Sequence, residues 1–108
     1  MSATLPGPLS AYFAAKNRHD IDAMLAPFSG RAVVEDEGRA MQGLPAIRAW
    51  MEETTRKYRA TYEVTDVAEA AGKTVVTALV SGTFAGSPAT LRFAFVLEGG
   101  KIVHLTCG

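Results

Sequence analysis

Residues 60–66 read Ala-Thr-Tyr-Glu-Val-Thr-Asp, and the hydrophobic period of the chain changes at this stretch. Before it, apolar residues recur mainly at intervals of three and four, which is typical of amphipathic helices. After it they alternate with polar residues, so that Tyr62, Val64 and Asp66 share one predicted strand face. Because helices dominate the first half and strands the second, the sequence predicts an α+β fold.

Three helices are predicted ahead of this point. The first carries an apolar stripe on which Tyr12 and Lys16 fall four residues apart. The second follows Asp20, a good N-cap residue, and its apolar spacing extends to Phe28. The third begins near Gly43, with a proline in its first turn.

Strands are predicted on both sides of the third helix. A short strand over residues 31–35 pairs with residues 39–42 ahead of that helix. Three more follow the alternating stretch, over residues 74–85, 89–97 and 101–107, with glycine-containing turns between them. This order predicts an antiparallel meander.

The strand over residues 89–97 is largely apolar on both faces. Phe93 and Phe95 share one face, and Ala94 and Val96 lie on the other. Helices can cover only one face of the sheet, and a large exposed apolar patch is unusual in a monomer. The sequence therefore predicts a homodimer joined through the sheet.

Length and composition exclude several classes of protein. The chain of 108 residues and 11.5 kDa suits one domain over residues 1–108. Its 11 basic and 11 acidic residues balance, so no basic excess indicates nucleic-acid binding. The single Cys107 rules out an intrachain disulfide, and no apolar run is long enough to span a membrane. With no signal-peptide pattern either, we expect a soluble cytoplasmic protein.

The order of elements resembles the NTF2-like superfamily. Two stretches carry the resemblance: residues 20–24 followed by residues 32–36, and residues 43–50. The Gly-Leu-Pro-Ala-Ile-Arg at the start of the latter is similar to the opening of the third helix in SnoaL-like proteins. The resemblance implies three N-terminal helices packed in a strongly curved, mostly antiparallel sheet that forms a cone with a pocket at its open end.

The ketosteroid isomerases of this superfamily offer a sharper comparison. Tyr12 lies eight residues before Asp20, and Asp36 lies sixteen residues after it in a Val-Glu-Asp context, as in that family. The resemblance implies that Asp36 is a general base and that Tyr12 donates a hydrogen bond to the developing enolate oxygen. Moving a proton next to a carbonyl needs both kinds of group.

Other positions depart from the isomerase pattern. Phe93 stands where that family has its second oxyanion donor, an aspartate, and phenylalanine cannot donate. Phe28 and Met51 stand where it has tyrosines that support the catalytic one. Losing one oxyanion donor costs about 3–4 kcal/mol of transition-state stabilisation, so efficient steroid isomerisation is not expected.

By the same comparison, the pocket should be apolar with few polar groups, as small-molecule sites usually are. Its predicted wall consists of Tyr12, Phe28, Asp36, Trp50, Met51, Phe93, Leu105 and Cys107. Such a wall suits a small, flat, apolar ligand with one polar end. No cluster at metal-ligand spacing and no glycine-rich phosphate loop occur, so neither a metal nor a cofactor is predicted.

Some assignments leave alternatives open at this point. Asp36 precedes a glycine turn, where acidic residues are common, and Tyr12 lies on a stripe where a tyrosine often belongs to the core. Glu35 and Asp36 point to opposite faces of their strand, so only one can face the pocket.

Two functions remain in view. The first is a proton-transfer enzyme of the isomerase, cyclase or lyase type that acts on an apolar carbonyl compound. The second is a ligand-binding or structural dimerisation domain that keeps the cone without the chemistry.

Overall fold

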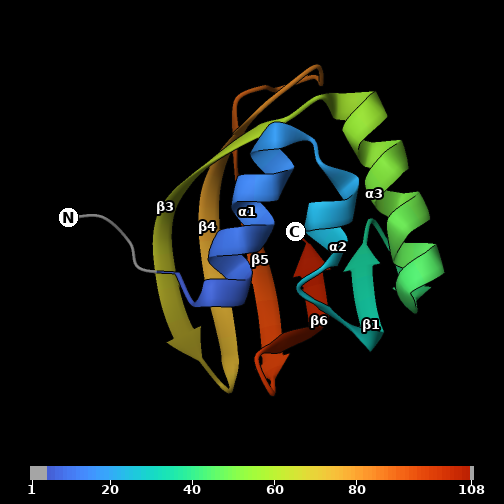
Figure 1. The fold of residues 1–108 in the computed structure, drawn as a ribbon. Coiled ribbons are helices and arrows are strands. Elements are labelled where there is room, and N and C mark those ends of the chain that lie inside the picture. The colour runs from blue at the N-terminus through green and yellow to red at the C-terminus, as the bar shows by residue number, and fades with distance from the viewer. Residues whose placement is uncertain (1–4, 108) are drawn as a thin grey trace.

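The structure is a computed structural model that describes residues 5–107 (Figure 1). Its helices are α1 (Gly7–Arg18), α2 (Ile21–Leu25) and α3 (Leu44–Tyr58). Its strands are β1 (Phe28–Asp36), β2 (Arg39–Gln42), β3 (Thr61–Ala70), β4 (Lys73–Ser81), β5 (Ala89–Glu98) and β6 (Lys101–Cys107). None of the helices in this part of the chain is long and apolar enough to cross a membrane.

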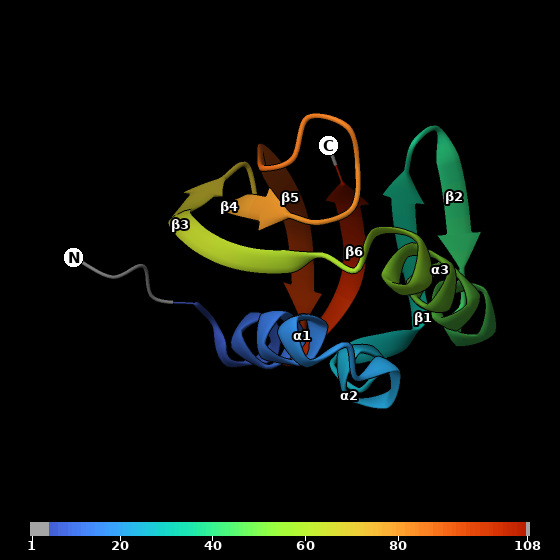
Figure 2. The same ribbon diagram turned by 90° about the horizontal axis from the view of Figure 1, so that it is seen from above.

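The six strands form one sheet in the order β2-β1-β6-β5-β4-β3. All neighbouring strands are antiparallel except β1 and β6, which run parallel. The sheet is strongly curved and does not close on itself, and the helices pack along its inner side (Figures 1 and 2). The predicted α+β cone with a mostly antiparallel sheet is therefore confirmed.

Aromatic side chains fill the interior between α1 and the sheet. The ring of Tyr12 packs edge-on against Phe28 at 5.5 Å and Phe95 at 5.8 Å between centroids. Phe13, on the same face of α1, packs against Phe93 at 5.8 Å. Edge-to-face geometry of this kind is the favourable arrangement for aromatic pairs. The α1 stripe predicted from the sequence thus forms the centre of the core.

The second helix is shorter than its apolar spacing predicted. It ends at Leu25, and Phe28 is the first residue of β1, paired with Ile102 of β6. Pro27 cannot donate the backbone hydrogen bond that would continue the helix. Phe28 matched the apolar spacing of the helix because β1 buries its ring in the same core that receives Met24.

Two strand predictions also need correction. A register shift between Val64 and Asp66 places Asp66 opposite Thr77 and leaves it exposed, so it does not share the face of Val64. Strand β4 ends at Ser81, four residues before the predicted end. At Gly82 the chain passes so close to the end of α3 that an added Cβ would lie 2.5 Å from the carbonyl oxygen of Tyr58.

Candidate active site

A cavity of about 550 Å³ lies where β1 and β6 end and β5 begins. Because β1 and β6 run parallel, their last residues reach the same edge of the sheet. Helices α1 and α3 and the segment over residues 82–88 supply the other walls. The largest aromatic and aliphatic side chains of the lining are Trp50, Tyr58, Tyr62, Phe84, Leu91 and Phe93. The basic and acidic side chains of the lining are Lys16, Asp36 and Glu37.

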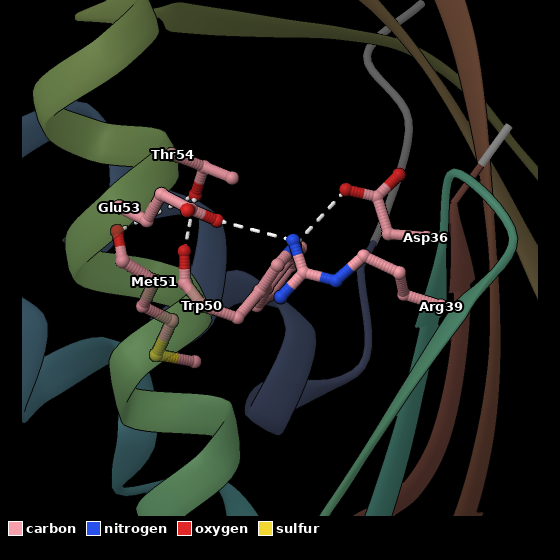
Figure 3. A network of polar contacts seen from close by, with 6 residues as sticks. All are labelled: Asp36, Arg39, Trp50, Met51, Glu53 and Thr54. Carbon is pink, nitrogen blue, oxygen red and sulfur yellow. Dashed lines mark hydrogen bonds and ion pairs between the residues drawn. The ribbon is translucent and has the colours of Figure 1, made fainter.

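Asp36 lies at this edge because it is the last residue of β1. The turn after it contains Glu37 and Gly38, both with positive φ, which reverses the chain into β2. One carboxylate oxygen of Asp36 accepts a hydrogen bond from the indole Nε1 of Trp50 at 2.9 Å (Figure 3). Among the residues described, Asp36 has no ion pair. The indole therefore orients a carboxylate that remains available at the cavity wall.

The two adjacent acids of β1 lie on opposite faces. Glu35 pairs with His104 of β6, with 2.6 Å between Oε2 and Nε2, and its side chain is half exposed. Strand alternation then turns Asp36 inward. The alternative between Glu35 and Asp36 is resolved in favour of Asp36 as the cavity-facing acid, and His104 lies on the outer face.

Trp50 is itself held in place by α3 and the β1–β2 hairpin. Arg39 of β2 donates to the carboxylate of Glu53 on α3 at 3.2 Å, which fastens the hairpin to the helix (Figure 3). Thr54 donates to the backbone carbonyl of Trp50 at 2.9 Å. These contacts keep the indole and the Asp36 carboxylate in one arrangement.

Lys16 is a buried lysine at the wall of the cavity, and its side chain is only 8% exposed. Its Nζ lies 4.5 Å from the ring centre of Tyr62, 5.1 Å from that of Tyr12 and 5.7 Å from that of Trp50. No ion pair of Lys16 occurs within residues 5–107. Burial lowers its pKa to about 8, and the negative charge of Asp36 opposes this shift.

The sequence analysis did not assign Lys16 to the site, although it placed the residue on the apolar stripe. The available signal was the spacing of Lys16, four residues after Tyr12, on a helix face that must enter the core. A lysine on such a face is unusual and indicates a functional position. Tyr62 and Phe84 were missed for another reason. They reach the cavity from β3 and from the segment after β4, whose positions depend on the sheet curvature.

Helix α1 and strand β3 are joined beside Lys16. The side chain of Asn17 donates to the carbonyl of Tyr62 at 2.9 Å and accepts from its N–H at 2.6 Å. His19, which ends the helix in a left-handed conformation, forms a 2.8 Å hydrogen bond from Nε2 to the carbonyl of Ala60. These contacts set the separation between the Lys16 amine and the Tyr62 ring.

The eight residues predicted as site residues divide into two groups. Those that line the cavity are Asp36, Trp50, Phe93 and Cys107. Those that are buried in the core and do not line it are Tyr12, Phe28, Met51 and Leu105. The aromatic rings of α1 fill the narrow end of the cone, so side chains at that depth are enclosed by packing.

Two further groups have pKa values set mainly by burial. Burial raises the pKa of the Cys107 thiol to about 12, and the negative charge of Asp36 adds to the rise. The thiol is therefore protonated and forms an apolar part of the wall. The pKa of Tyr12 is raised well above its ordinary value, and its hydroxyl has no hydrogen-bond partner among the residues described.

Metal ligation has no structural support in the described part of the chain. Residues 5–107 contain no group of three or more His, Cys, Asp or Glu side chains that could hold a metal ion together. The polar side chains around the cavity include one amine, two carboxylates and several hydroxyls, which can bind and move protons.

Comparisons with solved structures agree with this architecture. A candidate polyketide cyclase from Sinorhizobium meliloti has a TM-score of 0.91 and 36% identity, covering 96% of this chain and 95% of that one. A candidate polyketide cyclase from Pseudomonas putida has a TM-score of 0.80 and 24% identity, with coverages of 99% and 92%. A protein with a ketosteroid isomerase-like fold from Catenulispora acidiphila, in complex with trimethylamine, has a TM-score of 0.83 and 20% identity, with coverages of 97% and 86%.

The structures from Pseudomonas putida and Catenulispora acidiphila, at 24% and 20% identity, show only that the fold is shared. No curated protein matches the chain significantly. The family model of the SnoaL-like domain matches residues 9–105, which is nearly the whole chain. By this match and by the 36% identity over almost its full length, the chain belongs to the SnoaL-like domain family.

Proposed function

We propose that this SnoaL-like domain is an enzyme that binds a small apolar carbonyl compound and moves a proton on the carbon beside the carbonyl. The observation that carries the proposal is the carboxylate of Asp36 at the wall of an apolar cavity, oriented by the Trp50 indole at 2.9 Å. A carboxylate held this way has the position and the free lone pairs of a general base.

The cavity supports a small, mostly apolar ligand. Its volume of about 550 Å³ falls within the range of roughly 300–1,000 Å³ that is typical of small-molecule sites. Trp50, Tyr62 and Phe93 offer flat surfaces to such a ligand. The similarity to a candidate polyketide cyclase favours a reaction in which a carbon acid loses a proton and attacks another carbonyl.

In the proposed reaction, Asp36 removes a hydrogen from the carbon next to the carbonyl, and negative charge develops on the carbonyl oxygen. Trp50 keeps the carboxylate turned toward the cavity. The donor that the family resemblance implies for that oxygen is Tyr12, whose hydroxyl would have to reach the ligand from the core.

The first prediction concerns exchange of deuterium from solvent into apolar ketones. Asp36→Asn keeps the shape of the side chain and removes the base, so exchange should fall by about 10²–10⁴-fold while ligand affinity changes little. Nuclear magnetic resonance of the ketones follows the exchange. Exchange that continues unchanged in Asp36→Asn would exclude this mechanism.

Tyr12→Phe is the companion variant because it removes only a hydroxyl. A smaller drop in exchange would give the Tyr12 phenol a donor role, and unchanged exchange would make Tyr12 a core residue only. Both variants are compared with the unmodified protein after thermal unfolding has shown that they are folded.

A second candidate function is a non-catalytic ligand-binding domain. The observation that favours it is Phe93, an apolar side chain at the cavity wall where the isomerases have an acidic donor. In that case no ketone would exchange above background, and Asp36→Asn would alter only the affinity for a ligand. Ligand-induced increases in melting temperature measure that affinity in either case.

A further inference from the structure

The buried amine of Lys16 has no part in the proton transfer proposed above. Its neighbours are the faces of three aromatic rings, at 4.5–5.7 Å, and it has no ion pair within residues 5–107. Removing an ammonium from bulk water in this way is costly, because no carboxylate of the described residues forms an ion pair that would compensate for it. The same residue lines the cavity, so a ligand can reach it.

We propose that Lys16 is a nucleophile that forms a Schiff base with the carbonyl group of an apolar aldehyde or ketone bound in the cavity. The geometry provides the three requirements of such a site: an amine at the wall, an apolar enclosure and a carboxylate, Asp36, in the same cavity. A lysine desolvated in a hydrophobic pocket is one of the known ways to activate this nucleophile.

The amount of neutral amine supports the same role. Only the neutral form of lysine attacks a carbonyl, and burial lowers the pKa of Lys16 to about 8 from an ordinary value of 10.5. Near neutral pH this gives a roughly 300-fold larger neutral fraction than that of an exposed lysine. The rings of Tyr12, Trp50 and Tyr62 restrict where the amine can point.

The step is balanced without an oxidant or a reductant. The nitrogen of Lys16 attacks the carbonyl carbon, both amine hydrogens leave with the carbonyl oxygen as water, and a C=N bond replaces the C=O bond. Protonation of that nitrogen gives an iminium ion, which withdraws electrons from the adjacent carbon. A hydrogen on that carbon becomes acidic enough for a carboxylate such as Asp36 to remove it.

This inference rests on the proposed function for the nature of the ligand, and it adds a covalent imine step ahead of the proposed proton transfer. A protonated imine takes up the electrons that would otherwise develop as charge on a carbonyl oxygen. The site then does not need an acidic donor at the position of Phe93. The substrate class becomes apolar aldehydes and ketones that carry a hydrogen on the carbon next to the carbonyl.

The test is reductive trapping near neutral pH with 3-phenylpropanal and sodium cyanoborohydride. Reduction of the imine fixes the adduct, which adds the mass of the aldehyde less one oxygen atom. Peptide mapping by mass spectrometry separates Lys16 from the N-terminal amine and from the exposed Lys57, Lys73 and Lys101, which serve as controls in the same chain. We expect modification of Lys16 to be more than about tenfold faster than that of these three lysines.

Variants make the result specific. Lys16→Met and Lys16→Arg should lose the fast adduct, and Asp36→Asn should keep it, because the base acts after the imine has formed. Modification of Lys16 no faster than that of Lys57 or Lys73 would overturn the inference, as would an unchanged fast adduct in Lys16→Met.

The same samples distinguish this inference from the proposed function. Deuterium exchange that persists without trapping at Lys16 would overturn the Schiff base and leave Asp36 as the base of a direct reaction. Trapping without exchange would support the Schiff base and contradict proton transfer by Asp36.

Discussion

The charge of Lys16 is unfavourable for folding at neutral pH. In the unfolded chain its pKa has the ordinary value of 10.5, and in the folded protein it is about 8. A difference of this size corresponds to about 3 kcal/mol against the charged folded state, at about 1.4 kcal/mol for each pH unit. Below pH 8 both states are protonated and the whole cost is present. Between pH 8 and 10.5 the unfolded chain binds more protons, so the stability of the protein rises with pH.

Lys16→Met should therefore stabilise the protein at neutral pH by about 1–3 kcal/mol, because methionine fills the same space without a charge. The advantage should shrink between pH 8 and 10.5, as the wild-type amine becomes neutral in the folded state. Urea unfolding followed by circular dichroism at about pH 7 and about pH 10 measures both effects. Lys73→Met, at the exposed start of β4, is the control. A Lys16→Met protein less stable than the wild type at neutral pH would contradict this account.

At the scale of elements, the end of β4 is determined by contact with α3. The backbone N–H of Thr83 donates to the carbonyl of Tyr58 at 2.7 Å, and the Thr83 hydroxyl lies 3.0 Å from the same oxygen. The residue before it, Gly82, lies directly against that carbonyl. This contact turns the chain away from the sheet and brings Phe84 over the cavity, where its ring packs against Tyr58 at 6.0 Å.

Gly82→Ala should destabilise the protein by about 1–3 kcal/mol, because the new Cβ would lie 2.5 Å from the Tyr58 oxygen and the backbone must move. Gly30→Ala is the matched control, since a Cβ at Gly30 meets nothing within 4 Å. That change should alter stability by less than about 0.5 kcal/mol. Thermal unfolding of the two variants checks the contrast, and equal losses in both would argue against close contact at Gly82.

At the scale of the whole molecule, the helices pack against the inner side of the sheet and leave its outer side without a helical cover (Figure 1). The outer face of the central strands includes Val75, Ala94 and Thr106, which lie side by side in the sheet. All three are partly exposed in a single copy of the chain. An uncovered, partly apolar sheet face of this kind is typical of subunit interfaces.

We propose that this face joins two copies of the chain, so that light scattering after size-exclusion chromatography at micromolar concentration should give the mass of a dimer. Ala94→Glu places a charge between Val75 and Thr106 and should convert the dimer to a monomer. Ser10→Glu, on the exposed side of α1, should leave the dimer intact. A monomeric wild-type protein would contradict the proposal.

The sequence by itself determined the order of the elements and the fold class. The change of hydrophobic period near residue 60 separates helix from strand, because side-chain direction repeats every 3.6 residues in one and every two in the other. The same alternation placed Phe93 and Phe95 on one face of their strand, and both are buried in the structure. These are local properties, and they can be read without knowing what packs against them.

Depth within the cone was decided only by the tertiary structure. Tyr12 and Lys16 lie one turn apart on the same stripe, yet the first is enclosed by core rings and the second reaches the cavity. Sequence spacing gives the direction of a side chain but not how far the opposing surface lies from it. That distance depends on the curvature of the sheet, on the bulge after Val64 and on the close approach at Gly82, all of which arise from contacts between distant segments.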